Sequence, residues 1–357
     1  MSNELSIFAK RLKQARVLRK LSMEQLCELM GGQVSKQAIS KYESALMKPN
    51  STVLIALATA LDQTPDYFFR PFTYDADKLQ VSFRKKSSAG AKDVSALKVQ
   101  IQDDIERYLE IGDILGIEAN VSLRDPEKVI ATAEDMCLEA QKLRNEWGLA
   151  LNPIGNVQDL LESHGVKVIL TKASEEFDGV SGVVDGKHLI IVLNKKQPHI
   201  ERRRFTALHE LAHLLFDGNF PEDMSQHDKE KLCDTFANEM LIPSEVLREQ
   251  FHPKDKFTTQ ELIPLQCTYG ISINAILVKL HQIGILGEKR YRAYCMRRQQ
   301  DKKLKAYVEE SRYKENITDR FEAMVYSAIA KDLISISKAA TLLNCSVNTI
   351  RTKLNLI

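Results

Sequence analysis

Residues 206–216 read TALHELAHLLF, and this stretch decides how the middle of the chain folds. Its apolar residues recur every three or four positions, which is typical of an amphipathic helix. His209 and His213 are four residues apart, so they share one face of that helix. This spacing lets both imidazoles reach one zinc ion at about 2.0–2.1 Å. The stretch therefore predicts a metal-binding helix, and the alternative is a core helix with two histidines and no metal.

Glu210 directly follows the first histidine of this helix. It lies about 100° around the helix axis from His209, so its carboxylate can approach a metal-bound water without binding the metal. Zinc lowers the pKa of such a water toward about 7, and a nearby carboxylate then accepts its proton. We therefore expect Glu210 to be the catalytic general base.

A third ligand is expected in the segment EKLCDTFANEMLIP, residues 230–243. Glu230 lies 17 residues after His213 on the next predicted helix and suits the ligand role. Asp234 is four residues further on the same face, where it can accept the free N–H of a ligand histidine and fix its tautomer. His227 and Glu239 remain alternatives for the third ligand.

These segments resemble the ImmA/IrrE family of metallopeptidases. The resemblance rests on RRRFTALHELAHLLF, EKLCDTFANEMLIP and the upstream FDGVSGVV and IIVLN strands, and it covers about residues 140–285. It implies a thermolysin-like HExxH…E zinc site and a protein substrate. The typical substrate is a helix-turn-helix repressor, whose cleavage switches genes on under stress or during mobile-element induction. Ala212, Leu232 and Cys233 depart from the usual residues of the family, but none of them removes a ligand.

A predicted strand and a predicted hairpin precede the histidine helix. VKVIL at 166–170 predicts a strand, and SGVVDGKHLIIVLN at 181–194 predicts a hairpin that turns at Asp185-Gly186. Residues 188–194 suit either an exposed edge that a substrate peptide joins or a core strand. His188, Tyr269 and one of the arginines 202–204 are candidates for stabilising the oxyanion. For the arginines, the pattern favours a solvent-exposed charged run at the start of the helix.

The stretch LSMEQLCELMGGQVSKQAISKYESALMKPN, residues 21–50, predicts two helices joined by a turn. Ser22 and Gln25 form a capping box, and Gly31-Gly32 ends the first helix. The second helix presents polar side chains outward, as a helix that reads the major groove does. We expect DNA contacts from Ser35, Lys36, Gln37, Ser40 and Lys41. The alternative is a small helical bundle with a solvated basic face.

This segment resembles the XRE family of phage-repressor-like domains over about residues 5–70. The resemblance implies a five-helix DNA-binding domain. The turn GGQVS is about two residues longer than usual for the family, so which residue meets which base stays open. One such helix reads only a half-site, so we expect a homodimer on a double-stranded operator.

The tail SISKAATLLNCSVNTIRTKL, residues 335–354, repeats the helix-turn-helix pattern in a shorter form. It has a small Ala340, a turn at Asn344-Cys345 and a helix that starts at Ser346. Because it contains few basic residues, the pattern favours a packing or dimerisation module over a second DNA-binding element.

Composition adds bounds on the compartment and the partners. The net charge of +2 indicates no particular partner, so any basic surface must be local. No apolar run reaches about 18 residues and the N-terminus lacks a signal-peptide core, so we expect no membrane segment. The six cysteines form no CxxC pair and are expected to be reduced thiols in the cytoplasm.

We therefore expect a mainly α protein with a small β-sheet, of the α+β class. The expected segments are an XRE-like domain at 1–72, a helical linker at 73–135, a zinc metallopeptidase domain at 136–285 and a helical C-terminal region at 286–357. The favoured function is a DNA-binding regulator whose zinc endopeptidase domain cleaves a regulatory protein. The alternative is a repressor whose peptidase-like domain is a non-cleaving sensor or dimerisation module. The intact Glu210 favours cleavage, because a pure sensor needs no general base.

Overall fold

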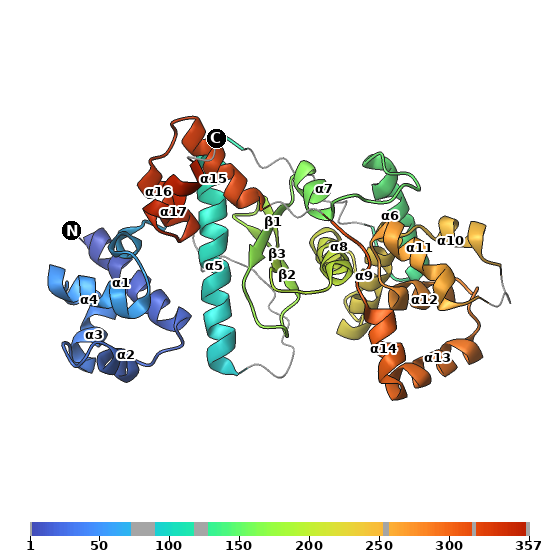
Figure 1. Ribbon diagram of the computed structural model, residues 1–357, viewed down its shortest axis with the longest axis horizontal. Coiled ribbons are helices and arrows are strands. Elements are labelled where there is room, and N and C mark those ends of the chain that lie inside the picture. Colours follow the sequence, from blue (N-terminus) through green and yellow to red (C-terminus); the bar gives the residue numbers. More distant parts are fainter. Residues whose placement is uncertain (1, 73–89, 118–127, 253–256, 316–318, 355–357) are drawn as a thin grey trace. The chain divides into compact units, whose positions relative to one another are not determined.

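The computed structural model describes residues 2–72, 90–117, 128–252, 257–315 and 319–354 (Figure 1). They divide into two compact units, with 2–72, 90–117 and 319–354 in the first and the rest in the second. The described elements are seventeen α-helices, one short 3-10 helix and a three-stranded sheet, which confirms the α+β class. Residues 73–89, with which the expected linker begins, lie outside the described residues.

The first unit begins with the expected helix-turn-helix domain. Its elements are α1 (Ser2–Leu18), α2 (Met23–Leu29), α3 (Lys36–Glu43), α4 (Ser51–Leu61) and the 3-10 helix η1 (Pro65–Phe69). The capping box is present, because Ser22 Oγ accepts from Gln25 N at 3.1 Å and Gln25 Oε1 accepts from Ser22 N at 2.8 Å. The fifth helix is only a 3-10 turn, which Pro65 begins.

Helix α5 (Ala91–Ile114) belongs to the same unit and packs on α1 and on α15 (Arg320–Ala330). Two buried arginines of the first domain, Arg11 and Arg70, pair with Asp103 and Glu106 on α5. Arg11 Nη2 lies 2.7 Å from Glu106 Oε2. This segment of the expected linker is therefore a packed helix. The unit is completed by α16 (Ile336–Leu343) and α17 (Val347–Leu354).

The sheet of the second unit has the order β1-β3-β2. Strand β1 (Lys167–Thr171) is parallel to β3 (His188–Asn194), and β2 (Gly179–Val184) is antiparallel to it. The predicted hairpin is confirmed, with φ of 51° at Asp185 and 67° at Gly186, as its tight turn requires. Every residue of β3 is buried between its two neighbours, so 188–194 is a core strand. The described sheet therefore has two edge strands, β1 and β2.

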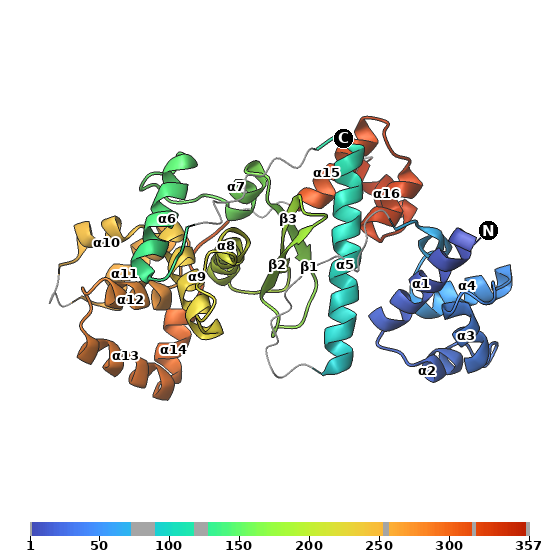
Figure 2. The same ribbon diagram turned by 180° about the vertical axis from the view of Figure 1, so that it is seen from behind.

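The histidine helix α8 (Ile200–Phe216) lies on this sheet and contacts both β2 and β3. Helix α9 (Gln226–Leu241) packs against the other side of α8 and against α6 (Ala133–Glu146), as both views show (Figure 2). Gly179 permits the close approach of β2 to α8, because a Cβ there would lie 2.7 Å from Thr206 Cγ2. The fold thus places α8 between the edge strand β2 and helix α9, which carries Glu230.

Six further helices complete the second unit. They are α7 (Val157–Ser163), α10 (Ser244–Gln250), α11 (Thr259–Tyr269), α12 (Ile273–Gln282), α13 (Glu288–Gln300) and α14 (Lys302–Glu309). Within the described residues, no single helix has the length and apolar character needed to cross a membrane. The pair α11–α12 meets that test only jointly, and it is bent by 105°.

Candidate metal centre

Three of the expected ligands converge between α8 and α9. His209 Nε2 lies 3.1 Å from His213 Nε2 and 3.1 Å from Glu230 Oε2. The distance from His213 Nε2 to Glu230 Oε2 is 3.8 Å. Ligands of one tetrahedral zinc ion, at about 2.0–2.1 Å from it, are separated by about 3.3 Å. Two imidazoles and a carboxylate at this spacing therefore fit a catalytic type of zinc site.

Each histidine is oriented through its other ring nitrogen. His209 Nδ1 lies 2.8 Å from Asp234 Oδ1, and His213 Nδ1 lies 2.7 Å from Asp217 Oδ1 and 3.3 Å from Cys233 Sγ. An N–H at Nδ1 that donates to a carboxylate leaves the Nε2 lone pair for a metal. The sequence reasoning missed Asp217, although its place four residues after His213 at the end of α8 was a usable signal.

The carboxylates around His209 favour a positive charge at this position. Burial lowers the pKa of His209, but hydrogen bonds to Asp234 and Glu230 and the charges of Asp234 and Glu210 raise it to about 9. The same arrangement stabilises a metal cation in place of the proton.

Glu210 lies on the side of α8 that faces β2 and is not one of the three clustered residues. Ser181, on the edge strand, donates its hydroxyl to Glu210 Oε2 at 2.6 Å. No motif in the sequence pointed to Ser181, because the contact depends on how β2 lies against α8. The contact holds the Glu210 carboxylate beside the sheet edge.

The alternative ligands lie elsewhere. Glu239 is fully buried, with Oε2 at 2.6 Å from Lys279 Nζ and a hydrogen bond from Ser244 Oγ at 2.6 Å. His227 is exposed in the first turn of α9 and is not part of the cluster. The structure thus brings Glu230 to the histidines, and brings neither alternative to them.

Two of the candidates for oxyanion stabilisation, Tyr269 and Arg204, make structural contacts. Tyr269 donates its hydroxyl to a backbone carbonyl at 3.2 Å. Arg204 is 2% exposed and donates to the carbonyls of Gly155 at 2.8 Å and Gly270 at 3.1 Å. The expectation of a solvated arginine run is therefore wrong for Arg204. Its partners are far away in the sequence, so the charge run alone could not show this.

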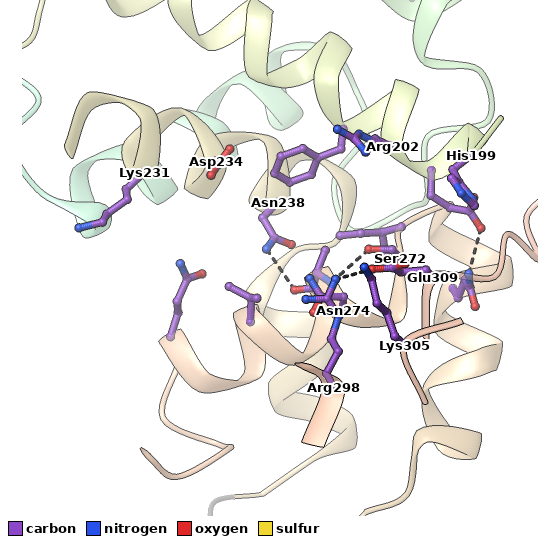
Figure 3. A pocket seen from close by; sticks show the side chains of 17 residues that line it. His199, Arg202, Lys231, Asp234, Asn238, Ser272, Asn274, Arg298, Lys305 and Glu309 are labelled. Carbon is purple, nitrogen blue, oxygen red and sulfur yellow. Dashed lines mark hydrogen bonds and ion pairs between the residues drawn. The ribbon is translucent and has the colours of Figure 1, made fainter. Parts of the chain in front are cut away.

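A cavity of about 680 Å³ opens beside Asp234 and is lined by α8, α9 and α11–α14 (Figure 3). Its wall includes Asn238 and Arg298. Asn238 Oδ1 and Arg298 Nε are buried and have no hydrogen-bond partner in the part of the chain that the structure describes. The cavity lies next to Asp234, the residue that hydrogen-bonds to His209.

The expected DNA-reading helix is α3. Ser35 caps it, because its Oγ accepts from Ala38 N at 3.2 Å. The remaining expected contact residues are all exposed: Lys36, Gln37, Ser40 and Lys41. Ile39 and Tyr42 on the opposite side are buried. The polar face of α3 is thus open to a partner.

Comparison with known families matches both halves of this description. Residues 12–68 match the family model described as helix-turn-helix, and residues 161–281 match the model described as the IrrE N-terminal-like domain. A direct comparison with curated proteins finds no match. The first match spans α2 and α3, and the second spans the sheet, α8 and α9 with the clustered histidines and glutamate. The chain therefore joins an XRE-type helix-turn-helix domain to an IrrE-like domain of the M78 peptidase type.

Proposed function

We propose that this protein is a DNA-binding transcriptional regulator whose IrrE-like domain is a zinc-dependent endopeptidase. The observation that carries the proposal is the convergence of His209, His213 and Glu230, with Glu210 held close by through Ser181. Zinc, when bound, supplies a water acidic enough to be a nucleophile at neutral pH.

Residues of the chain would transfer the proton, orient the histidines and position the substrate. Ser181 binds one oxygen of the Glu210 carboxylate, so the other oxygen can accept a proton from the water and deliver it to the leaving amine. Asp234 and Asp217 fix the histidine tautomers. A substrate peptide that adds to β2 as a further strand would run beside Ser181 and Glu210. We infer a protein substrate, with a helix-turn-helix repressor as the expected candidate, in stress or mobile-element control.

The proposal includes a homodimer and a cytoplasmic location. A dimer follows from the use of one reading helix per half-site. All six cysteines are free thiols, which is the state that the cytoplasm maintains.

We expect about one zinc ion per chain in protein purified without chelators. His213→Ala removes one of three donors, so zinc content should fall to less than about a tenth of an ion per chain. Elemental analysis after zinc reconstitution measures this. The matched control is His227→Ala, which removes an exposed histidine outside the cluster and should keep the metal. A loss of zinc in the control but not in His213→Ala would overturn the ligand assignment.

On the α3 helix, Gln37→Ala is expected to relax sequence preference by about 1–3 kcal/mol, because a glutamine amide reads base edges. Lys41→Ala should weaken binding to all sequences and reduce the salt slope by about one unit. Fluorescence anisotropy on a selected operator, repeated over a salt series, measures both effects. Unchanged binding by a variant with alanine at positions 36, 37, 40 and 41 would exclude α3 as the reading helix.

A second candidate function is a repressor whose IrrE-like domain senses a ligand and does not cleave. The cavity beside Asp234 favours it, since a ligand there would contact a residue that orients His209. The Glu210→Gln experiment below separates the two candidates.

A further inference from the structure

The C-terminal helices of the first unit form a small three-helix bundle. Helices α16 and α17 are joined by a three-residue turn, 344–346, and α16 packs on both α15 and α17. Its buried apolar side chains are Met324, Val325, Ala328, Ala339, Ala340, Leu342 and Ile350.

The local bonds of this bundle repeat those of the helix-turn-helix at α2–α3. Ser335 Oγ caps α16 by accepting from Lys338 N at 3.1 Å, as Ser22 does for α2. Ser346 Oγ accepts from Thr349 N at 3.1 Å, as Ser35 Oγ accepts from Ala38 N at 3.2 Å. Both motifs therefore begin each of their two helices with a capping serine.

The turns and the buried positions also correspond. Asn344 has φ of 49° directly after α16, and Gly31 has φ of 64° shortly after α2, so each turn uses a left-handed residue. Four residues after its capping serine, each second helix buries an isoleucine at 0% exposure, Ile350 in α17 and Ile39 in α3. The same backbone motif thus occurs twice in the first unit, and the second copy has the shorter turn.

The bundle contacts the rest of its unit through α15 and α16. Arg107 Nη1 on α5 donates to the carbonyl of Leu342 at 2.7 Å, and Lys338 pairs with Glu110 on α5. The rings of Tyr108 and Phe321 stack with centroids 6.1 Å apart. These contacts account for the packing role that the sequence favoured, and none of them uses the outer face of α17.

The outer face of α17 is polar and exposed. It carries Asn348, Thr349, Arg351, Thr352 and Lys353. Residues 333–357 contain three basic side chains and no acidic one. Lys353 pairs with Glu322, whereas Arg351 makes no ion pair with any residue that the structure describes.

We propose that α15–α17 is a second helix-turn-helix that binds double-stranded DNA, with α17 as its reading helix. Asparagine and arginine are the side chains that pair bidentately with adenine and guanine in the major groove. Asn348 and Arg351 lie three residues apart, so both side chains project from the same face of α17. The capped start of α17 also directs its first backbone N–H groups toward a phosphate. This inference does not depend on the peptidase proposal.

The test uses the full-length protein with inorganic zinc present throughout. DNA ligands are selected from a random duplex pool by the wild type, and the selection is repeated with the double variants Asn348→Ala/Arg351→Ala and Gln37→Ala/Lys41→Ala. The wild type should select DNA with two sequence elements. The α17 variant should lose the preference for one element and bind that element about 10- to 100-fold more weakly, while the α3 variant loses the other.

The matched control is Lys302→Ala/Lys303→Ala, which removes two exposed cations from α14 in the other unit. Thermal unfolding should be the same for the α17 variant and wild type, because both substituted side chains are exposed. Selection of an identical element by wild type and the α17 variant, or an equal loss of affinity in the α14 control, overturns the proposal. The proposal is also overturned if light scattering finds a dimeric wild type and a monomeric α17 variant. In that case α17 serves dimerisation.

Discussion

Glu210→Gln is expected to keep zinc and DNA binding and to lose cleavage of the partner protein by about 10²–10⁴-fold. The amide has nearly the shape of the carboxylate and can still hydrogen-bond to Ser181, but it cannot accept the proton of the attacking water. Because Glu210 is outside the ligand cluster, the metal content should not change. Loss of zinc would therefore mean that the assignment of Glu210 is wrong.

The informative assay compares cells that carry wild type, Glu210→Gln and the control Glu249→Gln, which changes an exposed glutamate on α10. Reporter output from the protein's own operator is measured alongside blots of repressor partners and of the protein itself. The peptidase proposal expects Glu210→Gln to lock the reporter off while an intact partner accumulates. Equal reporter output from all three proteins, with no partner cut under any stress, would leave the sensor function as the better account.

Lys279→Met is expected to destabilise the second unit by about 3–5 kcal/mol. Lys279 and Glu239 are 3% and 0% exposed, so the substitution leaves a carboxylate buried without its cation. Lys279 also donates to the carbonyl of Asn238 at 3.3 Å, and methionine loses that bond. The double variant Glu239→Gln/Lys279→Met should recover much of the loss, because it removes the buried charge as well.

Urea unfolding followed by the fluorescence of Trp147, the only tryptophan, reports on this unit. The control is Lys231→Met, which breaks an exposed pair with Asp228 and should leave stability close to that of wild type, because solvent screens such pairs. If Lys279→Met changes stability as little as this control does, the buried pair contributes little to the stability of the second unit.

The pH dependence of this pair has a definite sign. Burial raises the pKa of Glu239, but the charge and hydrogen bond of Lys279 and the bonds from Ser244 lower it below its ordinary value. The stability that this shift gives to the wild type is therefore present above the unfolded-state pKa and is lost as pH falls through the folded-state pKa. In Lys279→Met the positive charge that lowers the pKa of Glu239 is gone, so Glu239 becomes protonated at a higher pH than in wild type. The difference in unfolding free energy between variant and wild type should therefore shrink toward acid pH.

Local spacing explains what the sequence could predict. The clustering of His209 with His213, the capping box and the place of Asp234 follow from positions three or four residues apart on a helix, and the Asp185-Gly186 turn follows from two adjacent residues. Asp217 obeys the same rule and was simply overlooked.

Contacts between distant parts of the chain explain what the sequence could not predict. Ser181 reaches Glu210 across 29 residues, and Arg204 binds carbonyls 49 and 66 residues away. The order of the strands, which makes β3 central and leaves β2 at the edge, is not encoded in the periodicity of either strand. Ile101 and Ile105 of α5 are buried. The amphipathic pattern of α5 predicts a buried face, but it does not predict which helices cover that face.

The packing of α15 and α16 against α5 has a consequence for how the protein is made. The Arg107 bond to Leu342 joins residues 235 positions apart, so α5 cannot acquire this neighbour until Leu342 has left the ribosome. The second unit lies between them in the sequence and can fold during synthesis, whereas domains usually complete in order from the N-terminus. The first unit therefore closes after the second, and a chain that stops before α15 has an IrrE-like domain but lacks the helices that pack on α5.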